Sequence, residues 1–334
     1  MKVYYFEKDI RNVTEMYYGV ILSALKRKNI ETIPYKSASL KEIRSIDRNS
    51  YILITSLNTF IKLWVFGFRN FIYWFQGVTP EESRMQNGSN ARYYFWSFCE
   101  RLALKTVKYK IGVSTYLFKH FEKKYGLNIP LEDIFIMPCF NSDFHQESFF
   151  KNGKYSKNIF CFAGGMQPWQ GFEDIVSIFK KLECLYQNVF LKVYSKELEE
   201  AKEILSKYEI NNYSVECVPA DDMERVLSDC KFGFIIREDD VINNVATPTK
   251  LATYVGNGII PIYTPTIYSF ADLSKRYKYL CCTSKEDIIR SIEPYLQKEI
   301  DPNDVCEEYK RLFLDYYNKE AYVQKMMQFL DVES

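Results

Sequence analysis

The amino-acid sequence predicts an α/β protein with two doubly wound parallel sheets. Short apolar runs alternate with helical patterns along most of the 334 residues, as in βαβ units. This alternation stops once, at the polar stretch 143–158, and then restarts. The length also fits two domains of about 150 residues each. We therefore expect two domains around an interdomain cleft, with ligands at the carboxyl ends of the strands.

The first half, residues 1–142, shows five strand signals and three helix signals. The first strand is "KVYYF", and Thr14 is a plausible N-cap of the first helix. The strand "NFIYWFQG" is followed by a polar loop that contains a proline. The expected strands are 2–6, 51–57, 70–77, 109–114 and 134–140, and the expected helices are 14–29, about 90–107 and 115–126.

The polar stretch 143–158 is interpreted as the linker, and 159–305 as the second domain. Residues 306–334 form a helical tail that we expect to pack back on the first domain. The expected strands of the second half are 159–165, 189–195, 213–219, 232–236 and 259–262, and its helices are 171–186, 197–208, 221–229, 248–256 and about 302–330.

Composition excludes several classes of protein. The net charge is +1, with 44 basic and 43 acidic side chains, so nothing indicates a nucleic-acid binder. The N-terminus lacks the apolar core of a secretory signal, which favours a cytoplasmic protein. Nine cysteines without a C-x-x-C pair, and only His120 and His145, argue against a disulfide framework and a metal cluster. The uncharged run 251–271 is interrupted by Pro261 and Pro265, so it is not a membrane span.

The stretch "VATPTKLATYVGNGIIPIY" (245–263) outlines an anion site. Pro248 suits a first helical turn, and glycines then end the helix before a short apolar strand. Thr249 and Lys250 add a hydroxyl and an ammonium beside the free N–H groups of the helix start. The alternative is an ordinary surface helix with an exposed lysine.

Two further features follow strands of the second half. Gly164 and Gly165, in "CFAGGMQPWQGFEDI", permit a close approach of a ligand to the backbone, although they also suit a simple turn. The stretch is neither a G-x-G-x-x-G fingerprint nor a Walker loop. Arg237 follows the strand 232–236, where a guanidinium can hold phosphate, and the alternative is pairing with the acidic residues 238–240. Arg237 and Lys250 together would make a cationic clamp for a diphosphate.

Glu81 and Glu82 follow the strand 70–77, so one of them is a candidate base towards an acceptor hydroxyl. The alternative is that both stabilise the first turn of a helix. The aromatic stretch 60–75, with Lys62 and Arg69, is a candidate for membrane contact, although part of it reads as a core strand.

The runs "FAGGMQPWQGF", "VPADDMERVLSDCKFGFIIRE" and "NNVATPTKLATYVGNGIIPI" resemble the donor half of GT-B glycosyltransferases, close to glycosyltransferase family 4. "QGVTPEES", the later Glu100 and Arg101, and "GVSTYLFKHFEKKYG" resemble the acceptor half. The nearest likeness is to bacterial enzymes of capsular and other surface polysaccharide biosynthesis. The resemblance implies two Rossmann-like domains in the GT-B arrangement. It also implies a nucleotide-diphosphate sugar as donor, a glycan or polyprenyl-linked glycan as acceptor, no cofactor, and peripheral contact with the inner membrane face.

The resemblance also assigns residues, and it shows departures. Gln170 stands where many relatives carry a lysine, and Gln76 where many carry a histidine. The E-x7-E pair of the family, whose second glutamate usually holds the ribose, falls on Val245 and Thr253. Neither residue is acidic, so recognition of the donor hydroxyls must use other groups. Because Gln170 replaces the lysine, charge neutralisation rests on Arg237 and Lys250. The donor side comprises Gly164, Gly165, Gln170, Asn244, Pro248, Thr249 and Thr253; the acceptor side comprises Gln76 and Gly77; the catalytic candidates are Glu81, Glu82, Arg237 and Lys250.

Two other functions stay open at this point. A non-catalytic subunit that binds nucleotide sugars is compatible with the missing family glutamates. A nucleotide-sugar epimerase of the same fold is the second alternative, but it usually needs several acid/base residues, and the chain has few histidines.

Overall fold

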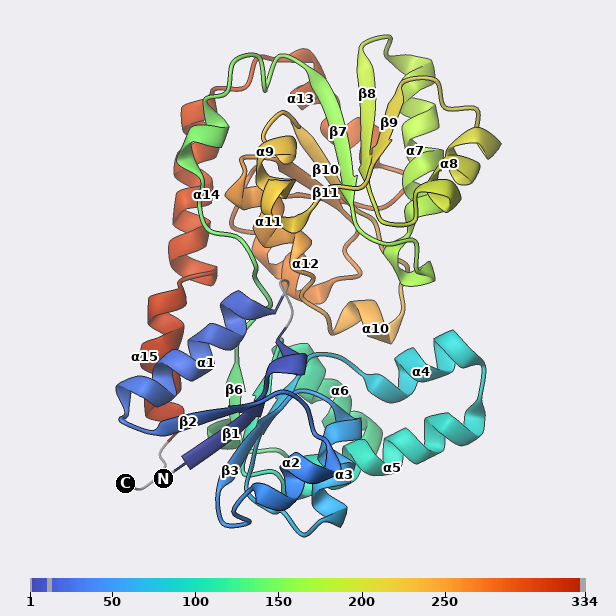
Figure 1. Ribbon diagram of the computed structural model, residues 1–334. Coiled ribbons are helices and arrows are strands. Elements are labelled where there is room, and N and C mark those ends of the chain that lie inside the picture. Colours follow the sequence, from blue (N-terminus) through green and yellow to red (C-terminus); the bar gives the residue numbers. More distant parts are fainter. Residues whose placement is uncertain (1, 11–13, 331–334) are drawn as a thin grey trace. The chain divides into compact units, whose positions relative to one another are not determined.

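The computed structural model describes residues 2–10 and 14–330, and the chain forms two compact units (Figure 1). Unit 1 comprises the residues up to Cys139, Val245–Thr247 and the residues from Asn318 onward. Unit 2 comprises Phe140–Asn244 and Pro248–Tyr317. No helix in the described part of the chain is both long enough and apolar enough to cross a membrane.

Unit 1 contains a parallel sheet with the strand order β2-β1-β3-β4-β5-β6. All five residues of β4 are buried, because helices cover both faces of a parallel sheet. The strand order reverses between β1 and β3, which is the topological switch point of this unit. The strands are β1 (Lys2–Phe6), β2 (Glu31–Tyr35), β3 (Tyr51–Ile54), β4 (Phe71–Phe75), β5 (Tyr109–Gly112) and β6 (Ile134–Ile136).

The helices of unit 1 begin and end at residues suited to those positions. The Ser114 side chain accepts a hydrogen bond from Leu117 N at the start of α6, and Gly126 ends that helix with a φ of 60°. The helices are α1 (Glu15–Arg27), α2 (Leu40–Ser45), α3 (Leu57–Val65), α4 (Thr79–Asn87), α5 (Asn90–Thr106), α6 (Thr115–Tyr125) and α15 (Lys319–Phe329), with short 3-10 turns η1 (Glu7–Asp9) and η2 (Leu131–Asp133).

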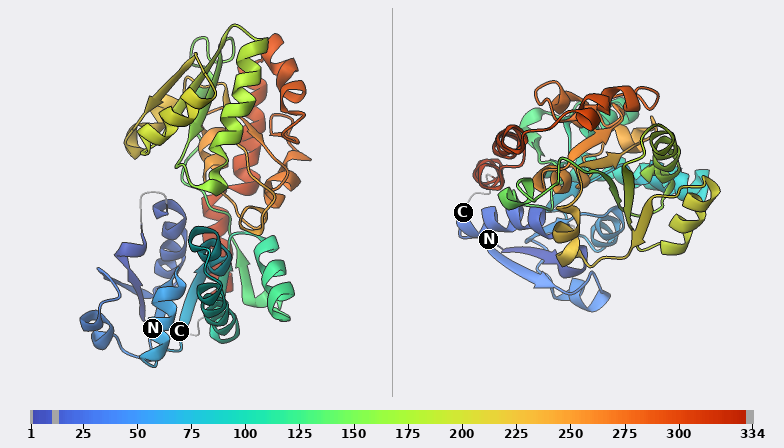
Figure 2. Two further views of the ribbon diagram at one scale, coloured as in Figure 1. Left: turned by 90° about the vertical axis from the view of Figure 1, so that its right-hand side faces the viewer. Right: turned by 90° about the horizontal axis from the view of Figure 1, so that it is seen from above.

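The last helix of the chain, α15, packs beside α1 within unit 1 (Figures 1 and 2). Arg27 Nη2 donates to Glu320 Oε2 at 2.9 Å, and Lys28 Nζ donates to Leu330 O at 2.7 Å. The preceding helix, α14 (Pro302–Tyr316), belongs to unit 2. The tail expected at 306–334 is therefore divided between the two units.

Unit 2 contains a second parallel sheet, with the order β12-β11-β10-β7-β8-β9. Read from the other edge, this is the doubly wound order 3-2-1-4-5-6, with its switch point between β7 and β10. The Phe160 ring stacks on those of Phe232 and Phe234, with centroids 4.8 and 5.4 Å away, and so joins these two strands. The strands are β7 (Asn158–Ala163), β8 (Val189–Tyr194), β9 (Tyr213–Glu216), β10 (Phe232–Ile235), β11 (Ile260–Tyr263) and β12 (Cys281–Cys282).

Most helices of unit 2 lie between these strands in the chain, and α13 and α14 follow the last strand. Besides α14 they are α7 (Phe172–Leu185), α8 (Leu198–Lys207), α9 (Met223–Leu227), α10 (Val241–Asn244), α11 (Lys250–Gly256), α12 (Tyr268–Ser274) and α13 (Ile288–Gln297), with 3-10 turns η3 (Gln146–Phe149), η4 (Pro168–Gln170) and η5 (Ala220–Asp222).

Several segments differ from the expectation, which also lacked β2, α2, α3, α10, α12, β12 and α13. Residues 79–87, expected as a loop, form α4, because Pro80 is compatible with a first helical turn. The helix expected at 248–256 begins only at Lys250. The polar stretch 143–158 is packed into unit 2 rather than free: Phe149 and Lys154 are buried, and Lys154 Nζ donates to Ser228 O at 3.1 Å. Composition misled here because the polar groups of this stretch bond to backbone carbonyls inside the unit.

Candidate functional site

The switch point of unit 2 brings the predicted donor residues together. β7 and β10 are hydrogen-bonded neighbours, with Phe232 paired to Phe160. β7 ends at Ala163 and is followed by Gly164, whereas β10 ends at Ile235 and is followed two residues later by Arg237. Both segments therefore lie at the same edge of the sheet, where doubly wound proteins bind ligands.

Arg237 is held rigidly at this edge. Only 4% of the residue is exposed. Its backbone N donates to Thr264 Oγ1 at 2.9 Å, and its guanidinium donates to Trp169 O and, through Nη2, to Gln170 Oε1 at 2.8 Å. Arg237 Nε is buried and has no hydrogen-bond partner among the described residues. Nε is therefore a buried donor whose hydrogen bond is not satisfied within the described protein.

Lys250 reaches the same amide. Its Nζ donates to Gln170 Oε1 at 2.6 Å and lies 4.1 Å from the centroid of the Phe162 ring. A Cβ atom at Gly164 would lie 2.5 Å from this Nζ, so a larger residue there would displace the ammonium. Gly164 thus supplies the space that Lys250 occupies. We call Arg237, Lys250 and Gln170 the cation cluster.

The cation cluster lacks a negative charge. No described carboxylate forms an ion pair with Arg237 or Lys250, and one neutral amide oxygen accepts from both. Burial lowers the pKa of Arg237 to about 10. Burial, and then the nearby charge of Arg237, lower the pKa of Lys250 well below its usual value. Two desolvated cations at one oxygen are a site that favours an anion.

The acidic neighbours of Arg237 have other partners, so the alternative pairing is not what the structure shows. Glu238 forms an ion pair with Lys285. Asp239 Oδ1 accepts from Asn244 Nδ2 at 2.8 Å, and Asp240 Oδ1 accepts from Ile242 N at 2.8 Å.

Asn244 and Thr253, two other predicted donor residues, have hydrogen-bond partners outside the cluster. Asn244 Nδ2 also donates to Thr266 O at 2.9 Å. Thr253 Oγ1 donates to Asn141 Oδ1 at 2.9 Å and lies 3.3 Å from Thr249 O, so its hydroxyl is satisfied within unit 2. Pro248 and Thr249 precede α11 and are half-buried, and Gly165 lies against the Gln167 side chain. The sequence did not indicate Trp169, Phe162 or Thr264, although Thr264 directly follows β11 at the ligand-binding edge.

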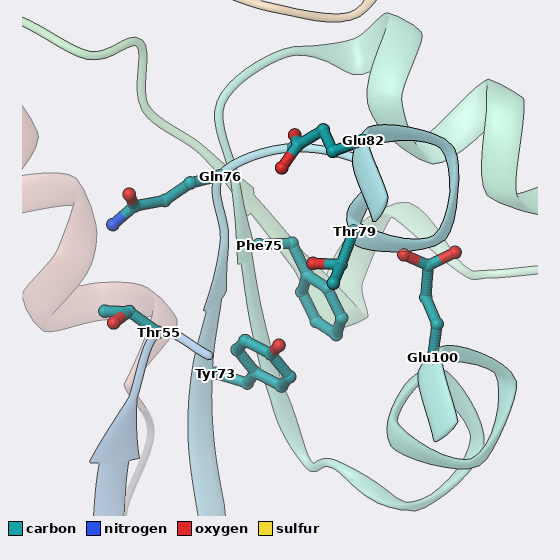
Figure 3. A pocket seen from close by; sticks show the side chains of 8 residues that line it. Thr55, Tyr73, Phe75, Gln76, Thr79, Glu82 and Glu100 are labelled. Atoms are coloured by element: carbon teal, nitrogen blue, oxygen red, sulfur yellow. The ribbon is translucent and has the colours of Figure 1, made fainter. Parts of the chain in front are cut away.

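Unit 1 carries a cavity of about 330 Å³ at the carboxyl ends of β3 and β4 (Figure 3). Its lining is mostly polar and includes the acceptor-side residues expected from the sequence, Gln76 and Gly77. The volume is at the small end of the range for ligand pockets. The lining residues are Thr55, Tyr73, Phe75, Gln76, Gly77, Thr79, Glu82 and Glu100.

Glu82 is the carboxyl group best placed for proton transfer in this cavity. A Cβ atom at Gly77 would lie 2.3 Å from Glu82 Oε1, so glycine is needed there for the carboxylate to lie where it does. Burial and the neighbouring charge of Glu81 raise the pKa of Glu82, and no ion pair joins Glu82 to a described cation. A carboxylate without a cation and with a raised pKa is suited to act as a base.

Glu81 is occupied elsewhere. It forms an ion pair with Lys124 at 2.8 Å and contacts His120 Nε2 at 3.3 Å. Burial alone would raise the pKa of Glu81, but the hydrogen bonds from His120 and Lys124 outweigh it and lower the pKa. Both glutamates lie in the first turn of α4, where acidic residues are favoured. The two neighbours therefore have different environments.

Glu100 closes this network from α5. It is 1% exposed, accepts from Tyr125 Oη at 2.6 Å and from Lys124 Nζ at 3.1 Å, and lines the cavity. Burial raises the pKa of Glu100 to about 7. The sequence indicated Glu100 only through the resemblance, because a carboxylate inside a helix gives no signal of burial. Across the described ranges, no group of three or more His, Cys, Asp or Glu residues is arranged to hold a metal ion.

No protein-family model matches the chain, and no curated protein matches its sequence. Solved structures do match its fold. Anabaena Alr3699/HepE, in complex with UDP and glucose, has 8% identity and a TM-score of 0.72 over 99% of this chain and 100% of its own. Sucrose-phosphate synthase from Thermosynechococcus elongatus has 10% identity and a TM-score of 0.68, with 98% of each chain covered.

S. aureus TarM, solved as a point mutant with fondaparinux, alpha-GlcNAc-glycerol and UDP, has 10% identity and a TM-score of 0.61. That match covers 85% of this chain but only 56% of TarM. The two parallel sheets and these structural similarities establish the GT-B fold for this chain.

Proposed function

We propose that this protein is a glycosyltransferase that moves a sugar from a nucleotide-diphosphate donor to a hydroxyl group of a glycan. The observation that carries the proposal is the cation cluster, in which Arg237 and Lys250 share the Gln170 oxygen without a carboxylate partner. Phosphate oxygens would supply the missing negative charge. The partnerless Arg237 Nε then gains an acceptor.

The cation cluster would act on the leaving group. As the bond between the anomeric carbon and the diphosphate oxygen breaks, negative charge develops on the diphosphate. Arg237 and Lys250 are already fixed by Gln170 and, for Arg237, by the Trp169 carbonyl and Thr264. Preorganised cations stabilise such charge without reorganising during the reaction, which is the main source of rate enhancement in this proposal.

The cavity of unit 1 would hold the acceptor sugar. Its hydroxyl oxygen forms the new bond to the anomeric carbon, and Glu82 takes the hydroxyl proton. Thr55, Gln76 and Thr79 line the same cavity and offer hydrogen bonds to the other hydroxyl groups. Glu81 supports the site by binding Lys124 and does not act on the acceptor.

The wider role follows from the sequence resemblance. We propose that the acceptor is a lipid-linked glycan in bacterial surface polysaccharide synthesis, handled by a cytoplasmic protein at the inner membrane face, and that no cofactor or metal is needed. HepE and TarM were both solved with UDP, which supports UDP-sugars as the first donors to test.

The test is to incubate the purified chain with a panel of UDP-sugars and glycan acceptors. Turnover is measured as UDP released, and the product is identified by its mass. The proposal predicts a glycosylated product, lost in Lys250→Met. Lys285→Met is the matched control, because Lys285 pairs with Asp174 and Glu238 and lies outside the cation cluster. Binding without any transfer would support the non-catalytic subunit, and interconversion of nucleotide sugars without acceptor would support the epimerase.

A further inference from the structure

Helix α5 exposes three large aromatic side chains. Tyr94 is 70% exposed, Phe95 53% and Phe98 67%. Single exposed apolar residues are common on protein surfaces, but three on one helix form a patch, and such patches mark interaction sites. Met85, on the contacting helix α4, is 40% exposed.

The helical spacing separates two faces of α5. Tyr94, Phe98, Arg101 and Lys105 follow at intervals of four, three and four residues, so they lie along one side of the helix. Cys99, Glu100, Ala103 and Leu104 are buried on the other side. We call the row of Tyr94, Phe98, Arg101 and Lys105, with exposed Phe95 at its edge, the outer α5 face.

The outer α5 face is basic as well as aromatic. Arg101 and Lys105 are exposed, and neither forms an ion pair with a described carboxylate. Exposed Arg92 in the first turn is also positive, but two residues before Tyr94 it lies on nearly the opposite side of the helix. The one acidic residue of α5, Glu100, is buried and paired with Lys124. The exposed charges of this helix are therefore all positive.

The stretch 60–75, which the sequence suggested for membrane contact, is used differently. Lys62 donates to the Ala38 carbonyl. Arg69 lies 4.6 Å from the centroid of the Trp64 ring and donates to Trp64 O at 2.7 Å. Residues Phe71–Phe75 are buried as β4. These two basic side chains donate to backbone carbonyls of the protein, so α5 is the better candidate for membrane contact.

We propose that the outer α5 face binds the surface of a bilayer that contains anionic lipids. Aromatic rings on an amphipathic helix enter the boundary between headgroups and acyl chains, and basic side chains beside them attract anionic headgroups. A second copy is a poorer occupant, because a symmetric interface would place Arg101 and Lys105 of one copy close to the same residues of the other.

The biological reason for membrane binding rests on the proposed function, because the proposed acceptor is linked to a lipid. The inner side of the same helix carries Glu100, which lines the acceptor cavity. A helix that lies on a membrane with its outer face would place that cavity near the headgroups, where the glycan of a lipid-linked acceptor is found. α4 and α5 pack against each other as a hairpin, so the cavity residues Thr79 and Glu82 belong to the same element (Figure 1).

The test is co-sedimentation of the full chain with two kinds of vesicle, one of phosphatidylcholine alone and one of phosphatidylcholine mixed with phosphatidylglycerol. We expect binding to the anionic vesicles to exceed binding to the neutral ones. Arg101→Gln with Lys105→Gln should lower the partition coefficient on anionic vesicles about 25-fold, at about fivefold per charge. Lys181→Gln with Lys298→Gln, which removes two exposed lysines elsewhere, should leave it unchanged.

A second pair of variants tests the aromatic part. Tyr94→Ser, Phe95→Ser and Phe98→Ser together should lower the partition roughly 100-fold, at about fivefold for each half-inserted ring. Leu131→Ser, Leu185→Ser and Leu314→Ser, all exposed elsewhere, are the matched control. Equal melting temperatures of the variants and wild type verify folding.

Two results would overturn the inference. One is equal binding to neutral and anionic vesicles; the other is a wild-type dimer in solution that the aromatic variant converts to a monomer, which would identify a protein interface. Vesicle binding needs no sugar donor. If the protein binds anionic vesicles but no nucleotide sugar, the membrane inference stands and the proposed function fails.

Discussion

Lys250→Met should change ligand affinity and stability in opposite directions. Lys250 Nζ and Arg237 Nη2 lie 2.6 and 2.8 Å from the same Gln170 oxygen. The two nitrogens are thus at most about 5.4 Å apart, and at an effective dielectric of about 20 two such charges repel by at least about 3 kcal/mol. Methionine keeps the packing on Phe162 and removes the charge. We expect the ligand-free variant to melt at a higher temperature than wild type.

The same variant should bind the donor more weakly. A hydrogen bond to a charged group contributes about 1.5 to 3 kcal/mol, so the affinity for a nucleoside diphosphate should fall about 10- to 150-fold by calorimetry. The pH dependence has a definite sign. The pKa of Lys250 is lowered in the native state, so the unfolded chain binds more protons between that pKa and its usual value of 10.5. Wild-type stability should rise with pH in that window, and the advantage of the variant should shrink.

Differential scanning calorimetry of the ligand-free proteins, at several pH values, provides the second readout. Lys285→Met is again the matched control, and it should be less stable than wild type because it breaks ion pairs with Asp174 and Glu238. Unchanged nucleotide affinity in Lys250→Met, or a clear loss of stability at neutral pH, would refute the reasoning.

Three other outcomes follow from the same contacts. Arg237→Lys keeps the charge but loses the planar fork, so turnover should fall at least about tenfold, and turnover within twofold of wild type would argue against a bidentate phosphate contact. Glu82→Gln should lower kcat by about 10²- to 10⁴-fold with little change in melting temperature, whereas Glu81→Gln should lower the melting temperature by weakening the Lys124 contact and spare much of kcat. The pKa of Glu100 is raised from 4.5 to about 7, so the native state binds more protons than the unfolded chain between these pH values. The melting temperature should therefore fall as the pH rises from about 4.5 to about 7. In a series of thermal scans at different pH values, Glu100→Gln should make this fall smaller.

The architecture was predictable because it depends on local patterns. The runs 2–6 and 232–236 are short and mostly apolar, as in buried strands, and the structure contains β1 and β10 there. Polarity misled at 143–158, since the partners of Lys154 are carbonyls distant in the sequence. The placement of α15 beside α1 involves residues distant in the sequence, such as Arg27 and Glu320, which no local pattern encodes.

The cation cluster was predictable in type but not in detail. The rule that ligands bind at strand ends indicated Arg237, and the helix start indicated Lys250, yet neither showed that Gln170 joins them. Glu81 and Glu82 are adjacent acidic residues that the sequence treats alike. Their difference arises from α6, which brings Lys124 to Glu81 and leaves Glu82 in the cavity.

The most direct test of the account is a calorimetric titration of the wild-type protein with UDP and UMP, repeated with other nucleoside diphosphates and their monophosphates. If Arg237 and Lys250 bind the diphosphate group, at least one nucleoside diphosphate should bind about tenfold or more tightly than the corresponding monophosphate. That advantage should be absent in Lys250→Met. If every diphosphate binds no better than its monophosphate, the cation cluster is not a diphosphate site and the central claim is wrong.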